Sequence, residues 1–234
     1  MTRAALPVDE VTVRGACRVT TAARTLVDVA RTWPEVHAVA ALDAALLRGL
    51  TTRADVRRVL GRQATVPGIP RTVRALYLAD GRAESWLETC GRLTLDALGL
   101  PSFVSQVELW VEGELLEVVD GWYPEAAVAV EFDGRIRYRR TQFGRTAEQE
   151  LWEEKRREDL LRSIGVRFLR VAYEDLSGGR RRRLEKSARR LLAVPGPERR
   201  ESRAVPRPEG RARGGDGEDD GWLARADDGV GRPG

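Results

Sequence analysis

Histidine, cysteine and lysine are scarce in this chain of 234 residues. It holds one histidine (His37), two cysteines (Cys17 and Cys90) and two lysines. One imidazole is too few for a histidine-bearing catalytic triad, an HNH-type nuclease, an HExxH metalloprotease or a multi-histidine metal site. The two cysteines lie far apart without CxxC spacing, so they indicate neither a disulfide framework nor a zinc ribbon. Any hydrolytic chemistry must therefore use carboxylates, Lys or Arg, with or without a divalent metal.

Long apolar segments are missing as well. The stretch from Val36 to Leu47 is interrupted by Asp43 and is shorter than the roughly 20 residues that a membrane-spanning helix requires. The first residues do not show the charged-then-apolar pattern of a secretory signal. We therefore expect a cytoplasmic protein without membrane contact, and we interpret His37, which lies in an alanine-rich helical pattern, as structural.

The charge balance is only mildly basic. The chain has 40 Lys and Arg against 36 Asp and Glu, a net charge of +4, which is a small excess for a protein that binds nucleic acid. Richness in Arg, Ala, Gly and Val is typical of a GC-rich genome, and it weakens each single arginine as a sign of nucleic-acid binding. The distribution of the charges is more informative than their sum.

Hydrophobic periodicity divides the chain into three parts. Residues 1–80 read as helices joined by short turns, the first beginning at Thr20 or Thr21 and the third at Thr51 or Thr52. Residues 81–194 read as a helix, three strands, a helix, a strand and a basic helix, which predicts an α/β fold with a mixed central sheet flanked by helices. Residues 195–234 are rich in Pro, Gly, Arg and Asp, and we expect them to be disordered.

Carboxylates gather where two of the predicted strands end. Asp120 closes the second strand, Glu131 lies near the end of the third, and Asp133 follows two positions later on the same face. If the two strands pair, Asp120 and Glu131 meet at one end of the sheet, where a cation such as Mg²⁺ would offset their repulsion. The alternatives are that Asp120 simply begins a turn and that Asp133-Gly134 forms a hairpin turn.

The segments around these carboxylates carry a family resemblance. Residues 118–125 and 129–134, with flanking residues that extend it to about 82–176, resemble the Vsr-like branch of the PD-(D/E)XK nucleases. The resemblance implies a restriction-endonuclease-like sheet and a Mg²⁺-dependent DNA endonuclease. It also implies that Asp120 and Glu131 bind the metal and that Asp133 and Glu88 belong to the catalytic site. Glu88 has a second interpretation, because Ser85 to Glu88 is also a helix capping box.

The sequence departs from that nuclease pattern at one catalytic position. Asp133 stands where the family has a lysine, and this block contains no histidine. Lys155, Arg135 or Arg137 would substitute only electrostatically, because arginine stays protonated and is a poor general base. The missing lysine favours a protein that keeps the fold and has lost the chemistry.

Two groups of basic residues are candidates for contacts with DNA phosphates. The first adjoins the carboxylates and includes an aromatic side chain, a combination typical of nucleic-acid contacts. Its members, with one arginine from the next helix, are Arg135, Arg137, Tyr138, Arg139 and Arg157. The second is the run Arg180 to Arg183 with the basic residues that follow it, for which a solvated helix face is the alternative. Arg157 has an alternative too, an ion pair with Glu154.

The N-terminal part carries a different resemblance. Residues 19–28 and 42–46 resemble actinobacterial AbiEi-type antitoxins of type IV toxin–antitoxin systems. This likeness implies a DNA-binding antitoxin or regulator whose partner is a cognate toxin or its gene. Such proteins usually begin with a winged helix-turn-helix, and the sequence shows none. The hypotheses are thus a metal-dependent DNA endonuclease or a non-catalytic DNA-binding antitoxin; the sequence does not indicate an oligomeric state.

Overall fold

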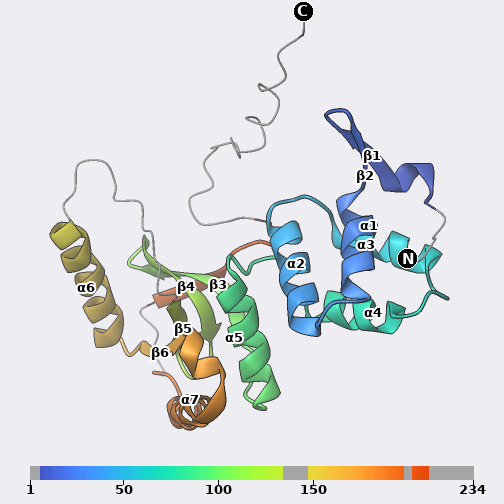
Figure 1. Ribbon diagram of the computed structural model, residues 1–234. Helices are drawn as coiled ribbons and strands as arrows, with labels where there is room; N and C mark the ends of the chain where they lie inside the picture. Colours follow the sequence, from blue (N-terminus) through green and yellow to red (C-terminus); the bar gives the residue numbers. More distant parts are fainter. Residues whose placement is uncertain (1–5, 134–146, 198–201, 211–234) are drawn as a thin grey trace, which may run out of the picture.

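The computed structural model describes residues 6–133, 147–197 and 202–210. The chain has an α/β fold, as predicted, in which a mixed five-stranded sheet carries helices on both faces. Figure 1 shows helix α6 on one side of this sheet, α5 and α7 on the other, and a helical unit beyond α5.

The helical unit is held by its own apolar core. Val27, Val39, Leu42 and Val56, from three different helices, are fully buried in it. Thr21 and Thr52 each accept a hydrogen bond from a backbone N–H of the helix that follows, so they are the N-caps that the sequence predicted. The helices are α1 (Ala22–Ala30), α2 (Glu35–Leu47), α3 (Arg53–Arg62) and α4 (Ile69–Leu78).

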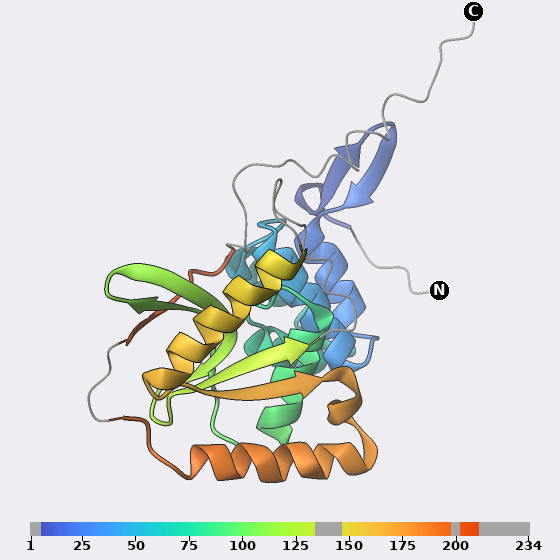
Figure 2. The same ribbon diagram turned by 90° about the vertical axis from the view of Figure 1, so that its left-hand side faces the viewer.

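A β-hairpin precedes these helices, which corrects the prediction of an all-helical segment. A short 3-10 turn, η1 (Val8–Glu10), leads into strands β1 (Val11–Arg14) and β2 (Cys17–Thr20), which pair antiparallel. The sequence analysis missed the hairpin because its strands have four residues each, too few for a clear alternation of burial. Nearly all of its residues are exposed, and it projects away from the rest of the molecule (Figures 1 and 2).

The central sheet has the strand order β6-β5-β4-β3-β7. Strands β5 and β6 are parallel and are joined through α6, whereas every other neighbouring pair is antiparallel. The elements that build this part are α5 (Trp86–Ala97), β3 (Val104–Val111), β4 (Glu114–Tyr123), β5 (Val128–Asp133), α6 (Ala147–Ser163), β6 (Arg167–Ala172), η2 (Tyr173–Leu176), α7 (Gly178–Leu192) and β7 (Ser202–Pro206). Their order up to α7 is the predicted one, and the β3–β4 turn lies at Glu112 and Gly113, both with positive φ.

The alternation of side chains along β5 matches the prediction. Val128, Val130 and Phe132 belong to the core between the sheet and helices α5 and α7. Ala129 belongs to the core on the opposite face, to which α6 contributes Leu161. Figure 2 shows α6 lying across that face and α7 running along the lower edge of the molecule.

Close packing of α5 against β5 depends on a glycine in the helix. A Cβ built on Gly91 would lie 1.9 Å from Cε1 of Phe132 and 2.6 Å from its Cδ1. Real carbon atoms do not approach so closely, so any side chain at this position would have to displace the buried phenyl ring. Gly91 therefore sets how near α5 comes to the sheet.

Strand β7 corrects the prediction of disorder from residue 195 onward. Residues 202–206 pair antiparallel with β3 at the edge of the sheet. The next residues contact the helical unit: the N–H of Gly210 donates to the carbonyl of Gly81 at 3.1 Å, and Arg53 donates to the Glu209 carboxylate at 2.7 Å. This segment is ordered although it has few apolar side chains, because backbone hydrogen bonds and ion pairs stabilise it. Amino-acid composition does not reveal such contacts.

Candidate functional site

A buried polar cluster joins α5 to strands β3 and β4. Gln106 Nε2 on β3 donates to Glu88 Oε2 on α5 at 2.9 Å and lies 3.4 Å from Asp120 Oδ1 on β4. The backbone N–H of Phe132 on β5 donates to Asp120 Oδ2 at 2.8 Å. All three clustered side chains are at most 9% exposed. Two of the predicted site residues, Asp120 and Glu88, are therefore brought together, through an amide that the sequence analysis did not single out.

The sheet register aligns the polar residues in one row. Ser105 pairs with Gly121 and Val107 with Val119, so Gln106 lies opposite Asp120. The β4–β5 pairing places Gly121 opposite Val130, and continuing it by one residue puts Asp120 opposite Glu131.

The row continues on both sides of these carboxylates. On β6, Arg170 is the partner of Glu131 in the parallel register. Beyond β3, the N–H of Arg207 donates to the carbonyl of Gln106 at 2.9 Å. Glu131 is half-buried and Asp133, the last residue of β5, is exposed. Asp133 thus lies at the strand end, two residues beyond the row.

Burial makes Glu88 a poor place for a negative charge. Loss of hydration and, second to it, the nearby charge of Asp120 together raise the pKa of Glu88 to about 7. Hydrogen bonds from the N–H of Glu84, from Ser85 and from Gln106 act against this rise. Glu88 also follows the N-cap Ser85, whose Oγ accepts its backbone N–H at 3.1 Å. The Ser85 half of the predicted capping box is therefore present, whereas the Glu88 carboxylate accepts from the N–H of Glu84, one residue before the N-cap, and from Gln106.

Gln106 is held in an unusual backbone conformation. Its φ is +51°, in the left-handed region that non-glycine residues rarely adopt, and its side chain is 1% exposed. Its Oε1 has no hydrogen-bond partner among the described residues. Strained and incompletely bonded residues occur preferentially at functional sites. The only sequence signal was a polar residue in an alternating strand, which does not reveal burial.

The described residues hold no complete set of ligands for a metal ion. Both oxygens of Asp120 have polar partners in the protein, and Oε2 of Glu88 accepts from both Gln106 and the N–H of Glu84. Within residues 6–133, 147–197 and 202–210, no group of three His, Cys, Asp or Glu is placed to hold a metal ion. The expected Mg²⁺ at Asp120 and Glu131 stays a prediction, and we derive no catalytic step from it.

The predicted DNA-contacting residues fall into two classes. Arg135, Arg137, Tyr138 and Arg139 lie outside the described residues. Arg157 on α6 lies 3.6 Å from the Glu117 carboxylate of β4, so it pairs across to the sheet.

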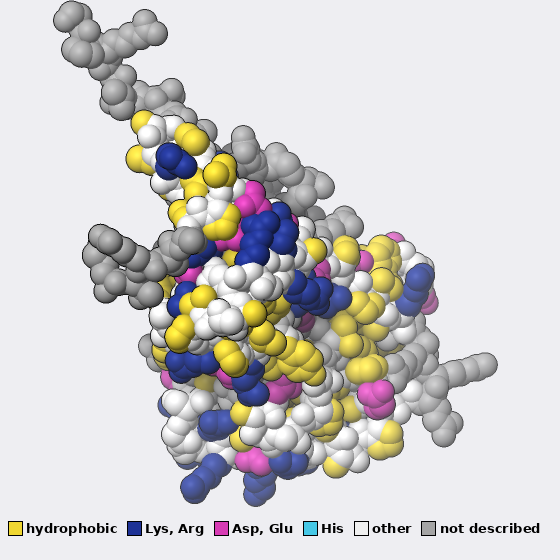
Figure 3. Space-filling model, turned by 90° about the vertical axis from the view of Figure 1, so that its right-hand side faces the viewer, with side chains coloured by type: hydrophobic (Ala, Val, Ile, Leu, Met, Phe, Trp, Pro, Cys, Tyr) yellow, Lys and Arg dark blue, Asp and Glu magenta, His cyan; other side chains and the backbone are white. Residues whose placement is uncertain are grey.

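The basic run on α7 is largely exposed. Arg180, Arg182, Arg183 and Lys186 are open to solvent, whereas Arg189 is paired with Glu185 at 3.1 Å. On the face of the helical unit seen in Figure 3, Lys and Arg side chains form several separate groups with carboxylates and apolar side chains between them. The predicted basic run at Arg180 to Arg183 therefore forms a dense, exposed positive segment in the first turns of α7.

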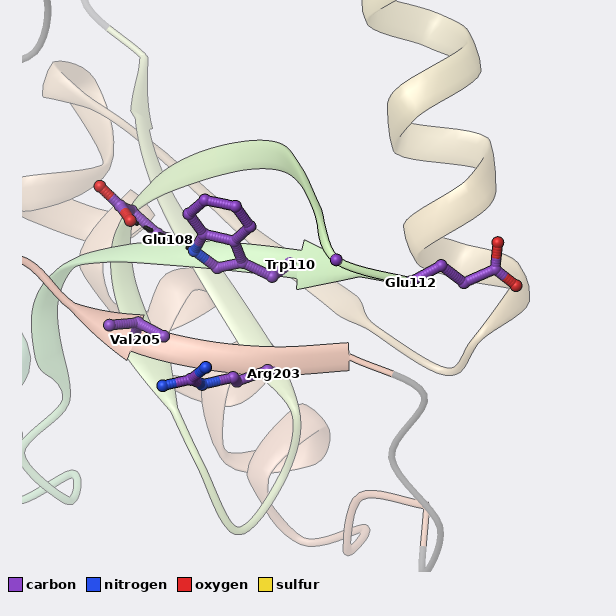
Figure 4. A pocket seen from close by; sticks show the side chains of 6 residues that line it. Glu108, Trp110, Glu112, Arg203 and Val205 are labelled. Carbon is purple, nitrogen blue, oxygen red and sulfur yellow. Dashed lines mark hydrogen bonds between the residues drawn. The ribbon is translucent and has the colours of Figure 1, made fainter.

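Two pockets lie outside the polar cluster. One, of about 470 Å³, is on the sheet surface formed by β3 and β7, where the Trp110 indole N–H donates to Glu108 at 3.2 Å. Figure 4 shows Glu108, Trp110, Arg203 and Val205 around this hollow, with Glu112 pointing away from it. The other, of about 370 Å³, lies between α2 and the start of α5. Neither pocket was predicted, because each combines segments that are distant in the sequence.

None of the described helices is both long and apolar enough to cross a membrane.

Comparison with known proteins shows similarity to two uncharacterized proteins from two strains of Mycobacterium tuberculosis. Each is 34% identical over 114 residues, which cover 49% of this chain and 42% of the relative. The chain thus spans less than half the length of these relatives. No solved structure matches the chain significantly.

A family match covers the helical unit and its hairpin. Residues 1–80 match the family described as AbiEi antitoxin C-terminal domain. This agrees with the resemblance on residues 19–28 and 42–46, while the likeness of residues 82–176 to Vsr-like nucleases stays a prediction. The N-terminal third of the chain is therefore similar to the C-terminal domain of AbiEi antitoxins.

Proposed function

We propose that this chain is a non-catalytic, DNA-binding antitoxin or regulator of a type IV toxin–antitoxin pair. The observation that carries the proposal is the match of residues 1–80 to the AbiEi antitoxin C-terminal domain. The cognate toxin, or the DNA that encodes the pair, is the partner. Residues 81–194, with strand β7, form a separate sheet domain in this proposal and present the DNA-contacting surface.

The chemistry of the polar cluster supports a role without catalysis. Asp120 and Glu88 use their oxygens to join three strands and α5, and Asp133 takes the place of the lysine expected in a nuclease. A buried carboxylate pair bridged by an amide stabilises one arrangement of the elements around it. In this proposal the row is a structural remnant of a nuclease-like sheet.

The exposed arginines of α7 are the proposed phosphate contacts. Arg180, Arg182 and Arg183 project from its first turns. Contacts of this kind give affinity that falls steeply as salt rises, by about one unit of slope for each phosphate neutralised. We expect Arg182→Ser with Arg183→Ser to weaken duplex binding equally for all sequences. Arg162→Ser is the matched control, because Arg162 is paired with Glu158 on α6.

Two assays test the proposal on the full chain. Fluorescence anisotropy with duplex DNA from the region upstream of its gene, measured across a salt series, tests binding; plasmid nicking with Mg²⁺ or Mn²⁺ tests catalysis. We expect salt-dependent binding without cutting, in the wild type and in Asp120→Asn alike. Metal-dependent cutting that disappears in Asp120→Asn would establish an endonuclease instead. Absence of duplex binding at low salt would contradict the proposed role as a DNA-binding regulator.

A further inference from the structure

A line of exposed aromatic rings crosses from the helical unit to the sheet domain. It consists of Trp33, His37, Trp86 and Tyr173, here called the aromatic row. His37 and Trp86 stack with ring centroids 6.3 Å apart and planes inclined by 26°, and Trp86 and Tyr173 lie 5.8 Å apart. Trp33, Trp86 and Tyr173 are 49%, 42% and 58% exposed. Soluble proteins seldom leave several large rings open to water in one place without a ligand for them.

The aromatic row borders the pocket between α2 and α5. Trp33, His37 and Trp86 line this space of about 370 Å³, which is within the range of small-ligand sites. Its apolar lining otherwise consists mainly of alanines, Ala40, Ala41, Ala44 and Ala83. Small side chains beside large rings leave a slot that suits a flat aromatic ligand better than a bulky aliphatic one.

The charges around the aromatic row separate its centre from its ends. Asp43 and Glu84 line the pocket, and a phosphate there would be repelled. Arg48 lies at one margin. At the other end, Tyr173 begins η2, which leads directly into the exposed arginines of α7. A ligand that offers flat rings to the centre and negative charge to the ends matches this arrangement.

We propose that the aromatic row binds single-stranded nucleic acid by stacking unpaired bases on Trp86 and its neighbours, with the backbone phosphates directed to Arg48 and α7. Base stacking on exposed aromatic side chains combined with flanking arginines is the general means of binding single strands without sequence preference. The site is separate from the buried Asp120 cluster. It shares the arginines of α7 with the duplex binding proposed above, whereas base stacking on Trp86 belongs to this site alone.

The test compares a short fluorescent oligothymidylate with a duplex of the same length, using anisotropy on the full chain. Loss of one stacked base weakens binding by about 5- to 150-fold. We expect Trp86→Ala and Tyr173→Ala each to weaken single-strand binding by roughly tenfold. Trp86→Phe should keep most of the affinity, because it retains an aromatic face. The matched control is Tyr77→Ala, which removes an 86% exposed ring on α4, outside the aromatic row.

The outcomes separate this inference from the regulator function. Lost single-strand binding in Trp86→Ala with unchanged duplex binding supports the aromatic row and leaves the regulator proposal standing. Wild-type protein that does not bind the oligothymidylate, or Trp86→Ala that binds it as tightly as Tyr77→Ala, overturns the inference whatever the duplex result. If substitutions in the aromatic row abolish binding of a protein partner and leave binding of the oligothymidylate unchanged, the inference is likewise overturned. Circular dichroism of each variant checks that the fold is kept.

Discussion

Replacing Glu88 by glutamine should remove a pH-dependent cost from the folded state. In the native protein burial raises the pKa of this carboxyl from its ordinary value of 4.5 to about 7. Between these values the folded state holds a proton that the unfolded state has released, so stability falls as pH rises. Each pKa unit corresponds to about 1.4 kcal/mol, so the full cost above pH 7 is about 3 kcal/mol.

Glutamine preserves the hydrogen bonds that Glu88 makes as an acceptor. Its amide oxygen accepts from the N–H of Glu84 and from Gln106 Nε2, as the carboxylate does now. We therefore expect Glu88→Gln to match the wild type near pH 4 and to exceed its free energy of unfolding by up to about 3 kcal/mol at pH 8. Urea denaturation followed by circular dichroism across this pH range measures the difference.

A second buried carboxyl requires a control in the same experiment. Burial also raises the pKa of Asp43 to about 6, against the opposing charge of Arg92 and a hydrogen bond from Thr89. Its contribution remains in Glu88→Gln, so that variant should still lose stability between about pH 4 and 6. Glu112→Gln, an exposed change of the same charge at the β3–β4 turn, should leave the pH profile unaltered. If Glu88→Gln differs from the wild type equally at pH 5 and pH 8, Glu88 is ionised in the folded protein and the reasoning is refuted.

Three further changes test the packing of the molecule. Gly91→Ala should destabilise the fold by about 1–3 kcal/mol, because the new methyl displaces Phe132; wild-type stability in urea would contradict this packing. Glu10→Ala should cost up to about 3 kcal/mol in thermal unfolding, because it leaves the buried Arg24 guanidinium with Asp28 as its remaining partner; an unchanged Tm would show that the pair contributes nothing. A chain ending at residue 200 exposes the edge of β3 and should self-associate in light scattering; a monodisperse monomer would show that β7 does not protect this edge.

Local patterns were sufficient for most of the secondary structure. The threonine caps, the alternation along β5 and the positive-φ turn at Glu112-Gly113 each depend on a few neighbouring residues, and all were predictable. The same is true of the approach of Asp120 to β5, because strand order and alternation together imply it. The hairpin at residues 11–20 and the strand at 202–206 were not predicted from the sequence. Short exposed strands are stabilised by backbone pairing with another strand, and a local sequence pattern does not show which segment that partner is.

The sequence by itself determined most of the helices and strands and which of their faces are apolar. It placed Glu131 near the end of a strand correctly, but Asp120, predicted to close a strand, lies inside β4, three residues before its end at Tyr123. Only the tertiary structure decided that Gln106 bridges Glu88 and Asp120, and that Trp86 lies between His37 and Tyr173. The physical reason is the range of the forces. Helix and strand formation depends on neighbours within a few residues, whereas burial, pKa and ring stacking depend on groups from segments far apart in the chain.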